Sequence, residues 1–190
     1  VSPETHMAAC NMSGMVAFHQ GDARAARDHL HAAVACHEPG RDAALYPIYL
    51  MDFGVFGRFY LALATWVSAP SDEAGEVASQ AFALAEQLGQ PHSLGFAMLA
   101  NMIVACMRDD DRTALPWAER CVAFARDMGF PEFVAMGLVI RGWARTRQGD
   151  PAAGLADMSD GMAQWQATGF GNWQTWFTHL QVQALWALRR

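Results

Sequence analysis

Histidine and cysteine, the side chains that most readily bind transition metals, concentrate at the start of this sequence. Five of the 7 histidines and two of the 4 cysteines fall within the first 37 residues. His6 and Cys10 are four residues apart and share a helix face, whereas His29 and His31 point to different faces. A transition-metal site needs three or four converging ligands. We therefore interpret these residues as solvent-facing or hydrogen-bonded and predict no metal and no cofactor, with metal or ligand contacts as the alternative.

Two acidic motifs have residue types suited to a divalent cation. Asp52-Phe53-Gly54 matches the metal-binding tripeptide of protein kinases, but no Gly-rich strand and no His-Arg-Asp loop accompanies it. We interpret Gly54 as a residue that permits tight helix packing. Asp109–Asp111 is interpreted as a solvated turn that caps the next helix, with cation binding as the alternative. The sequence contains no nucleophile signature and no phosphate-binding glycine motif, so we predict that the chain is not an enzyme.

Three glycines, Gly89, Gly129 and Gly169, lie forty residues apart, and each closes an amphipathic stretch of similar design. A fixed period of this length is typical of solenoids, in which each unit buries its apolar face against its neighbours. The residues that could contact a ligand must therefore be positioned by helices. We predict an all-α fold: a TPR-like α-solenoid of antiparallel helical hairpins, with about 40 residues per repeat and a right-handed superhelical twist.

Helix start and stop signals divide the chain into hairpins joined by short turns. We expect one helical-repeat domain over residues 1–190, and the abrupt ends suggest a fragment of a longer chain. The predicted hairpins span 3–37, 49–88, 92–128 and 132–168, followed by an unpaired helix over 173–190. Within them the expected helices are Pro3–His19, Ala23–His37, Tyr49–Ser68, Asp72–Leu88, His92–Arg108, Thr113–Met128, Glu132–Gln148, Pro151–Thr168 and Trp173–Arg190.

Composition restricts the class of partner. The formal net charge is -6, and all 13 basic residues are arginine, with no basic run. Direct nucleic-acid binding is therefore not expected. The apolar stretch Leu88–Met107 contains a proline and several polar residues, which argues against a membrane helix. The N-terminus lacks a signal peptide and the cysteines show no CxxC spacing, so we predict a cytoplasmic protein.

A stripe of large apolar residues follows the forty-residue period along the first helix of successive hairpins. A polar set lies four residues earlier on roughly the same face, and two further polar residues are again forty apart. Such a stripe suits a concave groove for a peptide or a small inducer; the alternative is the packing seam between these helices. The stripe is Phe56, Phe96, Met136 and Trp176; the polar residues are Asp52, His92, Glu132 and Asn172, together with Asn101 and Arg141.

The last predicted helix carries a concentration of aromatic and aliphatic residues with no hairpin partner. An apolar patch of that size is unfavourable in water. Two copies of the chain could bury it about a two-fold axis. As a second hypothesis, the sequence predicts a homodimer through Trp173, Trp176, Phe177, Leu180 and Trp186.

A family resemblance is carried by residues 129–144, then by Gly149, Gly154, Met158, Gly161, Trp165 and Thr168-Gly169. This pattern resembles the C-terminal helical repeat region of bacterial STAND-type signalling ATPases, which are fused to class III adenylate/guanylate cyclase or winged-helix domains. A second segment, Asp52–Trp66, resembles that family's second hairpin, with Phe53 where the family often has proline. The resemblance covers most of residues 18–180 and is strongest over 86–169.

This resemblance implies a sensor and scaffold arm. Its partners would be an inducer, a protein or peptide, and the ATPase domain of the same parent chain. The family contributes no catalytic residue here, because its chemistry resides in other domains. Two hypotheses stay open: a non-catalytic interaction and sensor scaffold, or a module for self-association alone.

Overall fold

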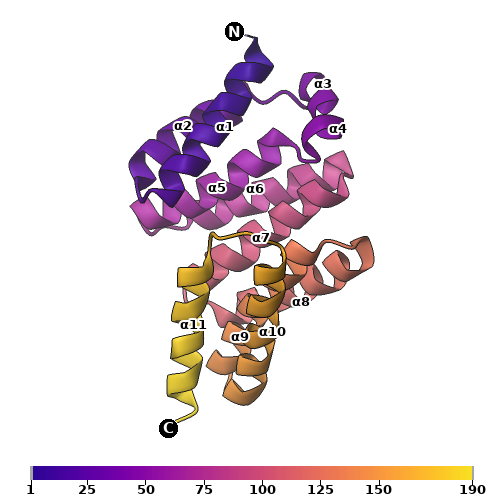
Figure 1. The fold of residues 1–190 in the computed structure, drawn as a ribbon. Coiled ribbons are helices and arrows are strands. Elements are labelled where there is room, and N and C mark those ends of the chain that lie inside the picture. The colour runs from indigo at the N-terminus through magenta and orange to yellow at the C-terminus, as the bar shows by residue number, and fades with distance from the viewer. Residues whose placement is uncertain (1, 190) are drawn as a thin grey trace. The chain divides into compact units, whose positions relative to one another are not determined.

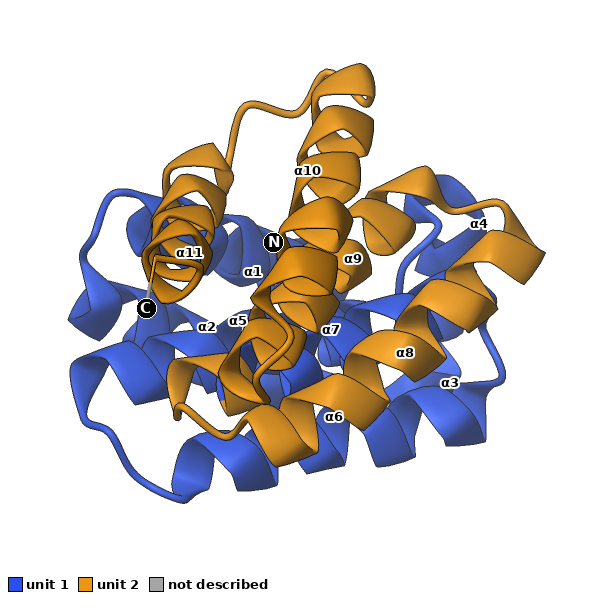
Figure 2. Ribbon diagram, turned by 90° about the horizontal axis from the view of Figure 1, so that it is seen from below, with its two compact units in different colours: residues 1–104 blue, residues 105–190 orange. Residues whose placement is uncertain are grey.

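The computed structural model describes residues 2–189, and every regular element in that range is helical. The chain divides into two compact units, one up to Val104 and one from Ala105 onward (Figure 2). The boundary falls within α7 (Pro91–Met107). The all-α class predicted from the sequence is confirmed for the described residues.

The first unit contains two helical hairpins. Helices α1 (Pro3–His19) and α2 (Ala23–Cys36) pack together, as do α5 (Phe53–Ser68) and α6 (Glu73–Leu88) (Figure 1). Helix α5 also packs against α2. The core between α5, α6 and the first part of α7 is built on Val55, Ala81, Ala85 and Ala97.

The second unit packs α8 (Asp111–Met128), α9 (Pro131–Arg147), α10 (Pro151–Ala167) and α11 (Gln174–Ala187) in chain order. Contacts between α9 and α10 are the most extensive in this unit. Small residues recur on the buried face of α8, where Ala114, Ala118 and Ala125 are fully buried.

Aspartate caps and left-handed glycines set the helix ends. Asp22, Asp110 and Asp150 each accept a hydrogen bond from the backbone N–H three residues later, which satisfies a donor that the helix leaves free. Gly89 and Gly129 end α6 and α8 with φ of 62° and 74°, a conformation that glycine adopts without steric cost.

The segment before α5 differs from the sequence prediction. The stretch between the expected helices Ala23–His37 and Tyr49–Ser68 forms short helical pieces: α3 (Pro39–Asp42), a 3₁₀ turn (Ala43–Leu45) and α4 (Tyr46–Tyr49). Helix α5 begins at Phe53 rather than Tyr49, because Leu50 takes a left-handed conformation and Asp52 caps the new helix. In residues 2–189 no single helix has the length and apolar character to cross a membrane.

Candidate ligand-binding surfaces

Asp52, predicted at the rim of a groove, is instead buried at the centre of a polar network. Its carboxylate accepts a hydrogen bond from the N–H of Val55 at 2.9 Å and lies 3.2 Å from Nε2 of His37. Both side chains are almost inaccessible, 2% and 3% exposed. A Cβ at residue 54 would overlap the His37 ring. Because residue 54 is glycine, the His37 ring can pack against α5 and reach Asp52, the residue that caps this helix.

Ser93 completes this network without forming a catalytic triad. Its Oγ accepts a hydrogen bond from the N–H of Asp52 and donates one to Oε1 of Gln90, both at 2.9 Å. A nucleophilic serine would be hydrogen-bonded to the histidine base, whereas the Ser93 hydroxyl is bonded to the backbone N–H of Asp52 and to Gln90. The network joins the end of α2 to the first turns of α5 and α7. No spacing of residues in the chain signals this network, because His37, Asp52 and Ser93 come from three separate elements.

The apolar stripe is mostly packed inside the protein. Phe56 is 4% exposed and Met136 is 1% exposed. The ring centres of Phe56 and Phe96 lie 5.2 Å apart in an edge-to-face arrangement, and the ring centres of His92 and Phe96 lie 5.2 Å apart in the same arrangement. These contacts are those of a packing seam. Phe96 and Trp176 remain partly exposed.

The two polar residues expected to face the groove are held by their own units. The Asn101 amide donates to the carbonyl oxygens of Ala78 and Ala97, at 3.0 and 2.9 Å. The guanidinium of Arg141 donates two hydrogen bonds, of 2.8 and 2.6 Å, to the carboxylate of Asp157. These bonds raise the pKa of Arg141. Both residues therefore fasten neighbouring helices together.

The remaining polar residues of the predicted groove lie near helix ends. Glu132 is partly buried in the first turn of α9. Asn172 is exposed, and its backbone carbonyl accepts a hydrogen bond from the Trp165 indole at 2.9 Å.

The N-terminal histidines and cysteines are dispersed. Nε2 of His6 lies 3.7 Å from Sγ of Cys10, and burial together with nearby Cys36 raises the pKa of that thiol. His29 and His31 are exposed. Among residues 2–189, no group of three or more potential ligand side chains is placed to hold a metal ion.

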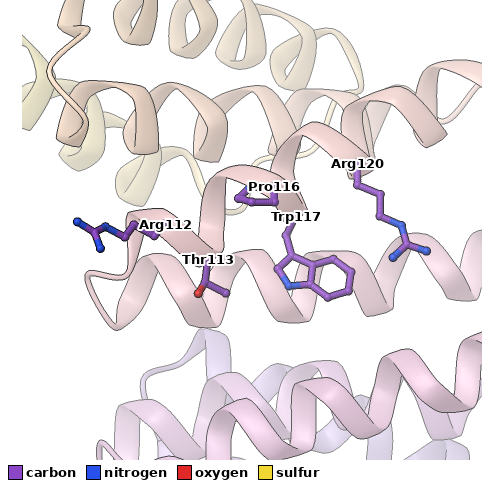
Figure 3. Close-up of a pocket in the computed structure, with 5 residues that line it drawn as sticks. All are labelled: Arg112, Thr113, Pro116, Trp117 and Arg120. Atoms are coloured by element: carbon purple, nitrogen blue, oxygen red, sulfur yellow. The ribbon is translucent and has the colours of Figure 1, made fainter.

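A shallow hollow of about 370 Å³ lies along α8 (Figure 3). It is lined by Arg112, Thr113, Pro116, Trp117 and Arg120, and the two guanidinium groups lie at its ends. The Arg120 guanidinium lies 5.5 Å from the centre of the Trp117 ring, a favourable cation–π arrangement. Because Pro116 has no N–H, the carbonyl of Arg112 loses its usual helical donor. The hollow thus offers two guanidinium cations and an aromatic face.

A second hollow, of about 440 Å³, lies between α2 and the end of α5. Its lining is more polar than that of the α8 hollow and includes side chains of both charge signs. Neither hollow was predicted from the sequence. The lining residues are Ala23, Arg24, Arg27, Asp28, His31, Ser68 and Ala69.

The aromatic patch predicted for the last helix is divided between two faces. Phe177 and Leu180 are buried, and Phe177 packs edge to face against Trp165 of α10 at 5.6 Å. They therefore belong to the core of the second unit and not to an exposed surface. Trp173 and Trp176 are partly exposed, and their ring centres lie 5.6 Å apart. The outer face of α11 includes the exposed apolar residues Val182, Leu185 and Trp186, with Trp186 62% exposed.

Comparison with known proteins adds no assignment: no protein-family model matches the chain, and no curated protein matches it.

Proposed function

We propose that the chain is a non-catalytic, TPR-like helical-repeat module that binds a protein or peptide partner within a bacterial signalling or transcription regulator. The observation that carries this proposal is the recurrence of a left-handed glycine at or just after the ends of α6, α8 and α10. Gly89, Gly129 and Gly169 lie forty residues apart, and all three have φ between 62° and 79°. Units of this period that stack on their neighbours form right-handed scaffolds with extended surfaces for partners.

The α8 hollow is the surface that we assign to the partner. Arg112 and Arg120 are separated by eight residues, which is about 12 Å along a helix. Arg112 makes no ion pair with any residue in the described part of the chain. Guanidinium groups bind carboxylates strongly and directionally. An acidic partner segment that places an apolar side chain on Trp117 would match this surface.

The resemblance of residues 86–169 to STAND repeat arms suggests what such binding would do. A partner or inducer that binds one arrangement of the hairpins more tightly than another shifts the equilibrium between them. In a parent chain that shift would bias an adjoining ATPase domain. A ligand with equal affinity for both arrangements would have no effect.

Site-specific photocross-linking in bacterial cells tests this assignment. A benzophenone amino acid at Thr113 should cross-link one partner protein, which mass spectrometry then identifies. The same group at Thr178, exposed on α11, is the control position. Cross-linking should fall about tenfold in the Arg112→Gln/Arg120→Gln variant, as expected when charge-assisted hydrogen bonds are lost. Equal cross-linking from both positions, or no effect of the variant, would contradict the proposal.

The outer face of α11 favours self-association as a second candidate function. Residues 174–188 contain no aspartate, glutamate, lysine or arginine, so two copies of this face would meet without like-charge repulsion. Sedimentation of the chain at increasing concentration tests this idea. A dimer that disappears in Trp186→Gln, but persists in the control Met128→Gln on α8, would establish it. A monomer at every concentration would rule it out.

A further inference from the structure

The hollow between α2 and α5 contains unpaired groups of opposite charge. Arg24, Asp28 and His31 are exposed, lie on adjacent turns of α2, and face away from buried Ala26 and Leu30. Within residues 2–189 none of the three forms an ion pair, although their spacing would allow pairs along the helix. These side chains are therefore available to a ligand.

Arg27 adds a second guanidinium that is already restrained. It pairs with Glu73 of α6 at 3.7 Å, and its side chain is 28% exposed. An ion pair this exposed contributes little to stability. It leaves most of the five guanidinium N–H donors free for a carboxylate. Arg24 and Arg27, one turn apart, thus form the donor side of the hollow.

The end of α5 forms the acceptor side. The N–H of Ala69 bonds to the carbonyl of Thr65 at 3.0 Å and is the last helical bond of α5. The carbonyl of Ser68 lies beyond that bond, where a helix end carries about half a negative charge. Asp28 adds a full negative charge to the same hollow. Donors and acceptors are therefore both present.

This arrangement selects among ligand classes. A simple anion would meet Asp28 and the carbonyl end of α5, and a simple cation would meet two arginines. A small zwitterion can satisfy both sides, and a hollow of about 440 Å³ falls within the usual range for small-molecule sites.

We propose that this hollow binds a free amino acid. The α-carboxylate is held by Arg24 and Arg27, and the α-ammonium group by Asp28 and the carbonyl of Ser68. The inference rests on the proposed function, because it names the chemical class of inducer that such a module would sense.

Calorimetric titration of the purified chain with each standard amino acid tests the proposal. At least one should bind, and acetate and methylammonium, which each carry one of its two charges, should bind about tenfold more weakly or not at all. Arg24→Gln and Asp28→Asn should each weaken binding about tenfold. The controls are Arg126→Gln and Asp127→Asn, which make the same charge changes at exposed sites on α8. Circular dichroism establishes that each variant is folded.

Three results would overturn the inference: no amino acid binds at millimolar concentration, acetate binds as tightly as the best amino acid, or inorganic phosphate binds more tightly than any of them. If binding is absent while cross-linking at Thr113 persists, only the amino-acid site fails and the scaffold proposal stands. If the amino acid binds and cross-linking fails, the partner surface on α8 is the part that is wrong.

Discussion

Gly142 of α9 and Gly154 of α10 approach each other so closely that neither has room for a Cβ. A methyl group on Gly142 would overlap the carbonyl oxygen of Gly154, and one on Gly154 would overlap the carbonyl of Gly142 and the hydroxyl of Thr146. The two backbones are therefore in direct contact. This contact places Asp157 of α10 opposite Arg141 of α9, where the two form their bidentate ion pair.

We expect Gly142→Ala to lower the free energy of unfolding by about 1–3 kcal/mol, because the helices must separate to admit the methyl group. We expect this loss of stability even though alanine is favoured over glycine within helices by about 1 kcal/mol. Urea unfolding followed by circular dichroism measures the change. Gly40→Ala is the control, since no atom lies within 4 Å of a Cβ there. Equal stability of both variants would show that α9 and α10 can move apart freely.

We expect Asp52→Ala to destabilise the protein far more than Asp22→Ala. Both carboxylates cap a helix, accepting from Val55 at 2.9 Å and from Ala25 at 3.0 Å. Loss of the exposed cap at Asp22 costs about 1 kcal/mol. Loss of Asp52 also leaves His37 buried without its partner, for a total of about 2–4 kcal/mol. Thermal unfolding of the two variants side by side measures the difference, and matching losses would mean that the His37 contact contributes nothing.

Asp42 should make the stability of the segment before α5 depend on pH. Burial tends to raise the pKa of Asp42, which is 3% exposed. Hydrogen bonds from the Arg41 guanidinium and the N–H of Glu38 outweigh burial and lower that pKa below 3.8. Because the folded-state pKa is the lower one, the carboxylate stabilises the fold above pH 3.8, and this contribution is lost as the pH falls through the folded-state value.

Asp42→Asn should therefore cost about 1–3 kcal/mol at neutral pH, because it removes hydrogen bonds to charged and buried groups. The cost should shrink as the solution is acidified below pH 3.8. Urea unfolding of both proteins over a series of pH values provides the measurement. A difference that stays constant across the series would show that ionisation of Asp42 plays no part.

Leu50→Gly should raise stability relative to Leu50→Ala. Leu50 has φ 56° and ψ 17°, and its side chain is 60% exposed. Residues with a Cβ are disfavoured in the left-handed region by about 1–2 kcal/mol. Glycine removes that strain, partly offset by the greater freedom of the unfolded chain. We expect a net gain of up to about 1 kcal/mol over the alanine variant. A higher melting temperature for alanine than for glycine would contradict this account.

Most helix boundaries could be read from the sequence because their signals are local. Prolines at the first helical positions, aspartate caps and terminal glycines placed the ends of α1, α2, α8 and α10 to within about two residues. Residues 38–48 were predicted as a connection between helices because the helices there are too short to show a period. Arg41 holds that segment through the carbonyl of Cys36 and through Glu4, and the contact with Glu4 links residues far apart in the chain.

The candidate sites were harder to predict from the sequence than the helix boundaries. Periodicity correctly grouped Phe56 with Phe96, but the same pattern serves a ligand groove and a packing seam equally well. Arg141 and Asn101 looked available because their partners, Asp157 and Ala78, lie on other helices. The two hollows arise where side chains from a helix surface or from two elements enclose space, which no spacing of residues encodes.

The sequence by itself determined the helical class, the caps and the forty-residue spacing of terminal glycines, because backbone conformation at these positions depends on neighbours within one or two turns. Only the tertiary structure decided that Asp52 and His37 form a buried pair, that Phe177 and Leu180 face inward, and that Arg24 and Asp28 share a hollow with the end of α5. Burial and pairing depend on which faces meet in space. Those contacts join residues that the chain order separates.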